Sequence, residues 1–506
     1  PGIPFLCDHP FFSHQKRIIL GNCGCYNPES IEEYIARGGY RSFVKAIRHY
    51  TYEEVCDIVE RSGLRGRSGG GYPTGLKWKQ ALNTSSTSRY LICNAKESDP
   101  GAFTDRLIME SDPHRLVEGV AIAAYAIGSS NGIVFYRRGS EHGRQRLQKA
   151  IDDAREYGLL GHNIFSSGYN LDIVIRQEPG AFVCGEETAL ISTLEGKRGM
   201  PQLKPPYPTT YGLFGKPTVI NNVETLMNIP VIMQHGPEWF RSFGTEGSPG
   251  TKIFALAGKG RLSGVVEVEM GTSFRTIIED IADGIKDGKK FKGIQIGGSS
   301  GSFLTPENLD LTVDFEEMRE NDLVMGAGGF VVIDEDTCIV DMVRYYMEFM
   351  RNESCGKCIP CREGTGRMLE ILENVIRKPS DEESVTTLER FKGVMQLETI
   401  ASVMKDTSLC GLGQTAPNPF LSALRNFREE FEEHIFDRKC RANVCRGLRT
   451  FVIDVDKCTG CTVCAAKCPA SAIYGTRLQP FFIVEEKCTG CGICYDVCKF
   501  SAIIIR

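Results

Sequence analysis

The sequence predicts a multidomain protein that combines α/β and α+β domains with a helical bundle and a cysteine-rich C-terminal domain. Its 506 residues exceed the size at which one hydrophobic core keeps growing. Strand-length apolar runs alternate with helical stretches in the first half, helical periodicity dominates after residue 338, and regularly spaced cysteines fill the end. The predicted segments are an N-terminal extension (1–50), an α/β domain (51–245), a small α+β module (246–335), a helical bundle (336–435), a hinge (436–450) and a terminal domain (451–506).

The α/β domain is predicted from one helix and three strands. Val55, Ile58 and Val59 recur at helical spacing, and Ser62-Gly63 ends that helix. Apolar runs predict strands at 90–93, 132–136 and 171–175. Strands that alternate with helices are typical of a layered domain with a largely parallel sheet.

The next two segments differ in periodicity. Strands are predicted at 252–258, 265–270 and 293–297, with a helix at 277–281. Amphipathic helices are then predicted at 341–351, 368–376 and 421–433, which favours a helical bundle.

A glycine-dense loop follows the first helix, from Gly63 to Trp78. Its glycines would allow backbone N–H groups to close on a phosphate, and Arg67 and Lys77 would add positive charge. A plain surface loop remains an alternative, because the loop follows a helix and not the strand that a dinucleotide-binding fingerprint requires.

The terminal domain contains two runs of the form C-x2-C-x2-C-x3-C. Such runs hold two [4Fe-4S] clusters, and the fourth cysteine of each run binds the other cluster. The predicted ligand sets are Cys458, Cys461, Cys464 and Cys498 for one cluster, and Cys488, Cys491, Cys494 and Cys468 for the other. Structural zinc or disulfides are disfavoured, because neither needs two interleaved triplets. The sequence therefore predicts a two-cluster ferredoxin domain that moves single electrons.

A third [4Fe-4S] cluster is predicted within the helical bundle. Cys355, Cys358 and Cys361 recur at every third position, and Cys410 supplies a remote fourth thiol. Zinc or inert core cysteines are the alternatives.

The hinge carries a candidate zinc site. His434, Cys440 and Cys445 offer three ligands of the kind that zinc prefers, but no fourth ligand is evident. Free thiols or a ligand from a partner chain are the alternatives. The remaining cysteines lack a tetrad and are expected to be ordinary small buried residues: Cys7, Cys23, Cys25, Cys56, Cys93, Cys184 and Cys338.

Composition indicates which compartment and which classes of partner are compatible with the chain. The 59 basic and 64 acidic residues give a net charge of −5, which argues against a general nucleic-acid binder. No apolar stretch approaches the roughly 18 residues of a membrane span. The 21 cysteines are mostly in cluster motifs, which predicts a reducing cytoplasm rather than a disulfide scaffold. The chain opens on Pro1 without a signal-peptide pattern, so the true start is expected to be missing.

Several motifs together resemble one family. They are the glycine loop, Asn94 to Gly101, Gly180 to Thr188, Leu203 to Pro208, Gly215 to Thr225, and the Cys355 tetrad. They are similar to the flavin- and NADH-binding subunit of respiratory complex I and its soluble relatives, from about residue 20 to 435. The appended ferredoxin domain resembles, within that family, the B subunit of electron-bifurcating, multimeric [FeFe]-hydrogenases.

The resemblance implies that the α/β domain binds FMN and NAD(H), and that the small module is a ubiquitin-like, soluble-ligand-binding domain. The implied FMN-site residues are Gly66, Arg67, Lys77, Asn94, Gly185, Glu186, Asn221 and Asn222. Gly69, Gly70, Lys96 and Asp99 are further cofactor-binding candidates. The implied NADH-site residues are Tyr72 and Tyr207 beside the adenine, with Glu97, Glu187 and Lys204 around the nicotinamide and riboses; Glu97 and Glu187 are the catalytic candidates. A carboxylate beside a ribose repels a 2′-phosphate, so NADH is expected over NADPH. Cys184 would lie near the flavin.

This chain departs from the family pattern around the same cavity. Lys96 stands where the family usually carries an aspartate, Ser68 where glycine is usual, and Glu178-Pro179 where Gly-Ala is common. A lysine that points at the flavin would stabilise its anionic reduced form and raise its potential. Alternatively, Lys96 turns to solvent or pairs with Glu97 or Asp99.

The sequence therefore predicts an NADH-oxidising FMN and iron–sulfur subunit of a soluble, electron-bifurcating complex. It would carry three [4Fe-4S] clusters and work with a thioredoxin-like [2Fe-2S] subunit, a larger hydrogenase-like subunit and ferredoxin. One alternative is the NAD module of a formate dehydrogenase or of an NAD/NADP/ferredoxin transhydrogenase. Another is a non-catalytic electron relay with an altered flavin site.

Overall fold

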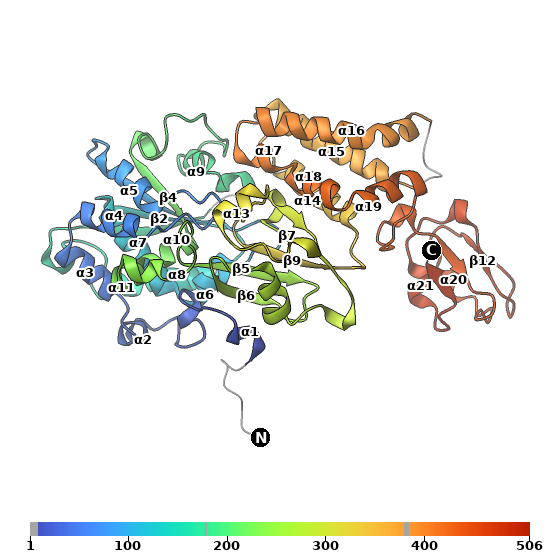
Figure 1. Cartoon of the computed structure of the whole chain (residues 1–506), viewed down its shortest axis with the longest axis horizontal. Helices are drawn as coiled ribbons and strands as arrows, with labels where there is room; N and C mark the ends of the chain where they lie inside the picture. The colour runs from blue at the N-terminus through green and yellow to red at the C-terminus, as the bar shows by residue number, and fades with distance from the viewer. Residues whose placement is uncertain (1–8, 178–179, 379–383, 506) are drawn as a thin grey trace, which may run out of the picture. The chain divides into compact units, whose positions relative to one another are not determined.

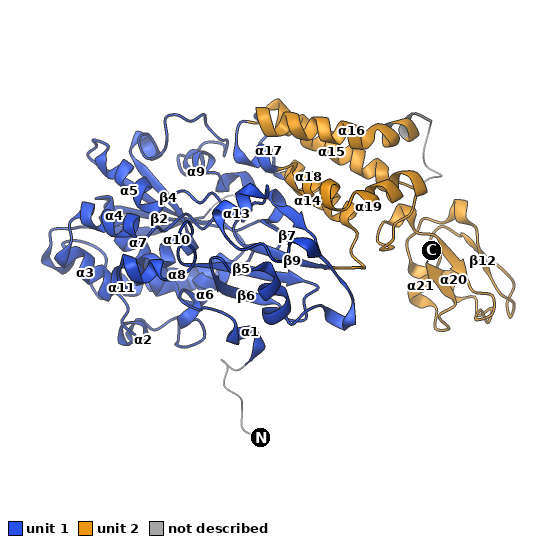
Figure 2. Ribbon diagram, in the orientation of Figure 1, with its two compact units in different colours: residues 1–333, 353–357, 409–415 blue, residues 334–352, 358–408, 416–506 orange. Residues whose placement is uncertain are grey.

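The computed structural model describes residues 9–177, 180–378 and 384–505 (Figure 1). Cys7 and the Glu178-Pro179 departure lie outside these residues. The chain forms two compact units (Figure 2). Unit 1 comprises residues 1–333, 353–357 and 409–415, and unit 2 comprises 334–352, 358–408 and 416–506.

Unit 1 contains a four-stranded parallel sheet. Its strands are β1 (Tyr90–Ala95), β2 (Asn131–Tyr136), β3 (Asp172–Gln177) and β4 (Thr218–Asn222), in the order β3-β2-β1-β4. The helices around it include α5 (Thr74–Asn83), α6 (Thr104–Ser111), α7 (Pro113–Ala126), α8 (Glu141–Glu156), α9 (Glu187–Leu194), α10 (Val223–Met227), α11 (Ile229–His235) and α12 (Pro237–Arg241). The predicted parallel sheet is present, with β4 as a strand that the sequence analysis did not predict.

The first predicted helix has the predicted bounds. This helix, α4 (Tyr52–Arg61), begins with a capping box in which Thr51 and Glu54 bond to each other's backbone N–H groups. Val55, Cys56 and Val59 form its buried face. Local sequence therefore determines both its start and its orientation.

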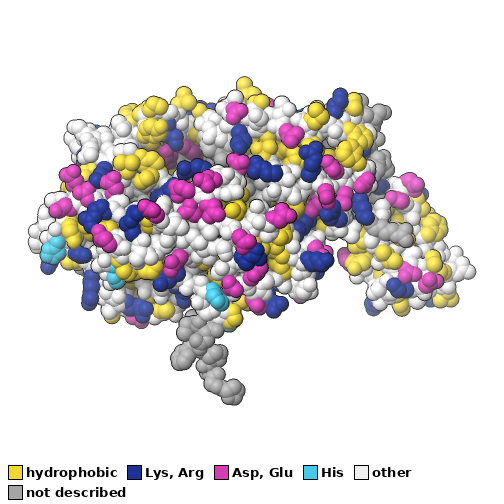
Figure 3. Space-filling view, in the orientation of Figure 1, with side chains coloured by type: hydrophobic (Ala, Val, Ile, Leu, Met, Phe, Trp, Pro, Cys, Tyr) yellow, Lys and Arg dark blue, Asp and Glu magenta, His cyan; other side chains and the backbone are white. Residues whose placement is uncertain are grey.

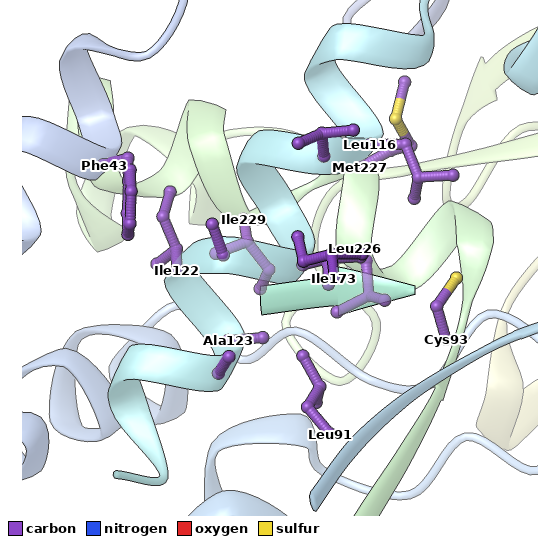
Figure 4. Close-up of a cluster of buried hydrophobic side chains, with 14 of the residues drawn as sticks. Phe43, Leu91, Cys93, Leu116, Ile122, Ala123, Ile173, Leu226, Met227 and Ile229 are labelled. Carbon is purple, nitrogen blue, oxygen red and sulfur yellow. The ribbon is translucent and has the colours of Figure 1, made fainter. Parts of the chain in front are cut away.

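The N-terminal segment is part of the domain core and not a separate extension. Its helices are α1 (Pro10–Ser13), α2 (Ile31–Ala36) and α3 (Arg41–His49). Ile19, Ile31 and Phe43 belong to the same hydrophobic cluster as Leu91 of β1. Figure 4 shows Phe43 near Ile122 of α7. Burial of these apolar side chains stabilises the segment on the α/β domain.

The small module is a five-stranded mixed sheet in the order β6-β5-β9-β7-β8. The strands are β5 (Thr251–Gly258), β6 (Gly264–Glu269), β7 (Phe291–Ile296), β8 (Ser302–Leu304) and β9 (Gly329–Asp334). A single π-helical turn, Thr276–Ile281, replaces the predicted helix at 277–281, and α13 (Phe315–Glu320) follows β8. Phe254, Phe274 and Phe330 occupy its core.

Unit 2 begins as a set of helices. They are α14 (Ile339–Glu353, whose last residue belongs to unit 1), α15 (Ile359–Ile376), α16 (Ser384–Thr407), α18 (Asn418–Asn426) and α19 (Arg428–Glu432). α17 (Gly411–Thr415) belongs to unit 1. The continuous helix predicted at 421–433 is wrong, because Phe427 leaves the helical region at φ −135° and ψ 36°. Its N–H still bonds to the carbonyl of Ala423, and this contact closes α18 before α19 begins.

The terminal domain of unit 2 has an internal repeat. Strands β10 (Phe451–Ile453) and β13 (Ile503–Ile505) pair antiparallel, as do β11 (Ile473–Tyr474) and β12 (Phe482–Ile483). A short helix follows the second cysteine in each run, α20 (Val463–Lys467) and α21 (Ile493–Val497). The repeated cysteine spacing therefore corresponds to a repeated local fold.

In the part of the chain that the structure describes, the helices show no membrane span and the surface charges in Figure 3 show no basic face. Among the described residues, none of the helices combines the length and the apolar character needed to span a bilayer. Side chains of both charges are interspersed on the face in Figure 3, which offers no continuous basic surface.

Candidate active site and metal centres

The sheet order places a candidate ligand site at the carboxyl ends of β1 and β4. The chain runs from β1 outward through β2 to β3 and then returns to the other side of β1 as β4. Ligands of open parallel sheets bind at such a reversal, outside the carboxyl ends of the strands. Asn94 pairs in register with Asn222 there, and Cys93 with Asn221. The structure thus brings together three predicted FMN-site asparagines.

Each of these asparagine side chains is held by a specific partner. Nδ2 of Asn94 donates to the Gly185 carbonyl at 3.0 Å, and Oδ1 of Asn221 accepts from Nε1 of Trp78 at 2.9 Å. Asn222 donates to Asp105 at 2.9 Å and accepts from the Glu224 backbone N–H at 2.9 Å. Sequence reasoning did not identify Trp78 or Asp105 as partners, because Trp78 is an apolar residue at the end of the glycine loop and Asp105 lies outside every motif.

The glycine loop leaves open space where a ligand is predicted. A Cβ atom on Gly70 would meet no atom within 4 Å, and one on Gly66 would come no closer than 3.7 Å to the Tyr72 carbonyl oxygen. Gly69 instead packs on the backbone of Gly326 and adopts φ +105°, so a side chain there would clash. The loop therefore combines a fixed backbone with an unfilled surface, which fits the phosphate-bearing cofactor expected there.

Arg67 does not present its charge to this space. Its side chain is buried, Nη2 donates to the Pro249 carbonyl at 2.5 Å, and the guanidinium lies 6.0 Å from the Phe315 ring centre. Burial lowers the pKa of Arg67 to about 10. Contacts from the small module enclose the guanidinium, and the predicted role of Arg67 in binding FMN stays a prediction.

Lys77, Glu187 and Lys204 form a charged group beside α9. Nζ of Lys204 lies 2.7 Å from Glu187, and Nζ of Lys77 lies 3.4 Å from Glu187 and 3.0 Å from the Ile220 carbonyl. Burial alone would raise the pKa of Glu187, but the two ammonium groups lower it overall. Glu186, the residue before Glu187, caps α9 by accepting from the N–H groups of Thr188 and Ala189. Glu187 is therefore a carboxylate held between two cations.

Two of the predicted NADH-site residues, Tyr72 and Tyr207, are exposed aromatic rings. Tyr72 is 48% exposed and Tyr207 is 57% exposed. The Tyr72 hydroxyl accepts from Nε2 of Gln80 at 2.8 Å. Exposed ring faces suit stacking on a purine, and their predicted role beside adenine stays a prediction.

Glu97 and Asp99 already have partners within the protein. The Glu97 carboxylate accepts from the Thr104 hydroxyl and the N–H groups of Asp105 and Arg106. Asp99 accepts from the Ser299 N–H at 2.8 Å and the Ser299 hydroxyl at 2.6 Å, and burial raises the pKa of Asp99 to about 6. These bonds fasten the 94–101 loop to α6 and to the small module. The predicted ligand roles of both carboxylates stay predictions, and the contacts to α6 do not favour that of Glu97.

Lys96 contacts Ser98 and Phe182 beside the candidate flavin site. Nζ of Lys96 donates to the Ser98 hydroxyl at 2.7 Å and lies 5.6 Å from the Phe182 ring centre. Cδ of Lys96 would be 3.5 Å from a Cβ atom on Gly185. The lysine therefore lies across from the Gly185 turn, while Ser68 of the glycine loop is exposed.

Unit 2 contains a four-residue group that could bind a metal ion, called here the metal-binding group. The potential ligand atoms of Cys338, His434, Cys440 and Cys445 all lie within 4.8 Å of one another, and the four residues are buried. Nε2 of His434 is 3.4 Å from Sγ of Cys338 and 3.4 Å from Sγ of Cys445. Nδ1 lies 2.6 Å from the Glu430 carbonyl, which orients Nε2 toward the thiols.

Cys338 is the fourth candidate ligand, which sequence reasoning missed. The sequence predicts an ordinary buried cysteine there, but its Sγ lies 3.6 Å from that of Cys445. The bonds from Cys338 and Cys445 lower the pKa of Cys440, which favours the thiolate that binds metals. Three sulfurs and one imidazole nitrogen fit the ligand set of structural zinc.

The cysteines of the terminal domain gather in two groups, and their role as cluster ligands stays a prediction. One cavity is lined by Cys468 together with Cys488, Cys491 and Cys494. In the other set, burial raises the pKa of Cys464, and the nearby thiols of Cys461, Cys458 and Cys498 add to the effect. Each group combines one triplet with the fourth cysteine of the other run.

The set predicted for a third cluster is divided between the two units. In unit 1, the Cys355 carbonyl accepts from Nη2 of Arg198 at 3.2 Å, and Cys355 contributes to the raised pKa of Cys410 after burial and Glu186. In unit 2, Cys358 precedes α15 and Cys361 lies in its first turn. This ligand set stays a prediction.

Comparison with family models identifies matches in both units. Residues 59–231 match the Nuo51 FMN-binding domain. Residues 341–434 match the NADH-ubiquinone oxidoreductase-F iron–sulfur binding region, and residues 450–499 match a 4Fe-4S dicluster domain.

Whole proteins and a solved structure are also similar. The chain is 49% identical to the NADP-reducing hydrogenase subunit HndC of Solidesulfovibrio fructosivorans, over 92% of this chain and 93% of that protein. It is 41% identical to the F 2 subunit of the NADH-quinone oxidoreductase of Rhizobium meliloti, over 84% of this chain and 98% of that protein. The crystal structure of an NAD+-reducing [NiFe]-hydrogenase in the H2-reduced state matches with a TM-score of 0.72 and 30% identity, over 83% of this chain and 67% of that one.

Proposed function

The chain belongs to the family of the F subunit of NADH-quinone oxidoreductase, and from this premise we propose that it exchanges hydride with NAD(H) at a bound FMN and conducts single electrons through three [4Fe-4S] clusters. The observation that carries the proposal is the reversal of strand order beside β1, where Asn94, Asn221 and Asn222 lie together and Trp78, at the end of the open glycine loop, bonds to Asn221. FMN supplies the conversion between a two-electron hydride and single electrons.

The protein side chains would bind and orient the two nucleotides. Asn94 and Asn222, each fixed by a hydrogen bond, would hold FMN with the glycine-loop backbone. Lys77 would place positive charge near the cofactor, and Glu187 with Lys204 would contact NADH. Tyr72 and Tyr207 would cover the adenine. Fixed contacts of this kind align the two rings before hydride transfer.

The cysteine sets would then carry the electrons. Cys355, Cys358, Cys361 and Cys410 would hold the cluster that accepts electrons from the flavin, and the terminal domain would hold two more. The crossed grouping of Cys468 with the second triplet supports this arrangement. Zinc at Cys338, His434, Cys440 and Cys445 would stabilise the hinge without redox chemistry.

The finer setting we infer is a soluble, cytoplasmic, electron-bifurcating complex of the [FeFe]-hydrogenase type. The similarity to a hydrogenase subunit supports it, and a thioredoxin-like [2Fe-2S] subunit, a larger hydrogenase-like subunit and ferredoxin would be the partners. The alternatives are the NAD module of a formate dehydrogenase or of a transhydrogenase. The word NADP in the name of that relative favours testing NADPH beside NADH.

An anaerobic titration tests this function. FMN and iron are first quantified in the cluster-reconstituted chain, and NADH is then added while flavin and iron–sulfur absorbance are followed. We expect one FMN per chain that bleaches with NADH before the clusters are reduced. FMN that stays oxidised with NADH, while dithionite still reduces the clusters, would instead identify an electron relay.

A further inference from the structure

Asp105 is a buried carboxyl group behind the candidate flavin site that none of the predicted roles uses. It lies in the first turn of α6 and is 4% exposed. Its Oδ2 accepts from Nδ2 of Asn222 at 2.9 Å. Because Asn222 is one of the residues expected to hold FMN, a single amide connects Asp105 to the flavin site.

The charges around Asp105 do not balance. The charged groups that face it are Glu97 in the preceding loop, Glu224 on α10 and Lys252 on β5, while the Cys93 thiol on β1 also lies within its electrostatic influence. Lys252 forms a buried ion pair with Glu224. The buried Arg67 guanidinium also acts on Glu224. Three carboxyl groups therefore face two cations, and an excess of buried negative charge is unfavourable.

A proton relieves this imbalance. Burial, and then the charges of Glu97 and Glu224, raise the pKa of Asp105 well above its ordinary value. The Glu97 carboxylate cannot relieve the imbalance by moving away, since three donors from the start of α6 hold it. The buried group formed by Asp105, Glu97, Glu224 and Lys252 is therefore able to hold a proton at Asp105.

Water has access to the same turn of α6. A cavity of about 150 Å³ is lined by Glu97, Phe103 and Arg106, which lie on both sides of Asp105 in the sequence. This volume exceeds the space that one water molecule requires. The cavity reaches Glu97, whose carboxylate accepts from the Asp105 N–H, so a proton from water has only the first turn of α6 to cross before it reaches Asp105.

We propose that Asp105 is a redox-linked proton site of the flavin pocket, which takes up one proton from water when the bound flavin is reduced and releases it when the flavin is reoxidised. The inference rests on the proposed function. A hydride from NADH adds two electrons and one hydrogen nucleus to FMN, which leaves one net negative charge, and the proton on Asp105 compensates that charge. When the clusters remove the two electrons, the hydrogen nucleus leaves the flavin as a proton, and Asp105 returns its own proton to water.

Asn222 couples reduction of the flavin to protonation of Asp105. Its amide donates to Asp105 and accepts from the Glu224 N–H, so it cannot rotate without breaking one of these bonds. A negative charge on the far side of this amide favours the neutral form of the carboxyl group. Asp105 is thus a positioning residue that also titrates with the flavin.

The test is the pH dependence of the flavin midpoint potential in the FMN-loaded, full-length chain. Asp105→Asn preserves the shape and an acceptor oxygen for Asn222 but cannot bind the proton. At pH values above the pKa at which the reduced flavin itself binds its second proton, we expect the wild type to take up two protons per electron pair over part of the range, and Asp105→Asn to take up only one. Equal proton stoichiometry in both proteins overturns the inference.

Asp112→Asn is the matched control. Asp112 is also a buried aspartate of unit 1, but it accepts from Tyr26 and Asn22 and contacts none of the predicted flavin residues. We expect this variant to retain the wild-type stoichiometry. A loss equal to that of Asp105→Asn would show a general effect of buried charge and would overturn the assignment.

Infrared difference spectroscopy on the wild type covers the case in which Asp105→Asn does not fold. Reduction should produce a band of a protonated carboxyl group that shifts in D2O, beside the normal flavin bands. Normal flavin bands without the carboxyl band overturn the proton site alone. Missing flavin bands in NADH-treated wild type would contradict the proposed function itself, and the inference with it.

Discussion

At the scale of single residues, Lys96 is the departure most directly connected to redox function. Its ammonium group bonds to Ser98 and lies near the Phe182 ring, across from the Gly185 turn. Asn94, which precedes it by two residues, bonds to the Gly185 carbonyl. The positive charge therefore belongs to the wall of the candidate flavin site. A nearby cation stabilises anionic reduced flavin more than oxidised flavin.

Removing this charge should lower the flavin midpoint potential. We expect Lys96→Gln to lower it by tens of millivolts, and Lys96→Asp to lower it further, because charges a few ångströms apart near a protein surface interact by roughly 1 to 4 kcal/mol. Spectroelectrochemical titration of the FMN-loaded protein measures the change. Lys197→Gln, at an exposed lysine paired with Glu195, is the control and should leave the potential unchanged. An unaltered potential in both Lys96 variants would exclude the electrostatic role.

At the scale of elements, buried carboxylates join segments that are distant in sequence. Glu267 on β6 accepts from the N–H groups of Ile19 and Leu20 and from the Thr251 hydroxyl. The N-terminal segment is thereby fixed to the small module, while its apolar residues enter the α/β core. This explains why a segment predicted as an extension is part of the fold.

Truncation of Glu267 should destabilise unit 1. We expect Glu267→Ala to lower the free energy of unfolding by about 2 to 5 kcal/mol, because each buried N–H without a partner costs about 1–3 kcal/mol. Glu269→Ala, on the same strand but half-exposed with Lys16 4.0 Å away, should cost less than about 1 kcal/mol. Thermal unfolding followed by circular dichroism would compare the two. Similar melting temperatures would show that the Glu267 contacts contribute little.

At the scale of the whole molecule, the metal-binding group connects parts of unit 2 that are far apart in sequence. Cys338 stands just before α14, whereas His434, Cys440 and Cys445 follow the last helix of the bundle. Cys338 and Cys445 are 107 residues apart. A metal here would close a long loop of chain directly before the terminal domain.

Cys338→Ala should remove most of the bound zinc. Loss of one of four ligands should weaken binding by more than about 100-fold, the upper range for loss of an outer-shell partner. Metal analysis of the purified protein should give one zinc per chain in the wild type and substoichiometric zinc in the variant. Cys56→Ala, at another buried cysteine outside the group, should retain its zinc. Full zinc occupancy in Cys338→Ala would contradict the four-ligand site.

The sequence alone determined the features that depend on residues close together in the chain: the cysteine triplets, the bounds of α4 and the open glycine loop. The spacing within each cysteine run predicts a triplet of ligands, since a short turn and helix place thiols three residues apart on one side. The capping box at Thr51 and the apolar spacing after it gave the bounds of α4, because these signals act within one helical turn. Glycine density likewise indicated the open loop at Gly66 and Gly70.

Only the tertiary structure decided which distant residues meet. Cys338 had no local pattern, so its place beside His434 followed from packing of α14 against the end of the bundle. Arg67 is free to face a ligand as far as its neighbours in sequence show, but the small module encloses its guanidinium. Asp105 gained importance from the pairing of β1 with β4, which puts Asn222 beside Asn94. Burial and charge balance depend on which distant segments pack together. The spacing of residues in the sequence predicts contacts only within a few turns of the chain.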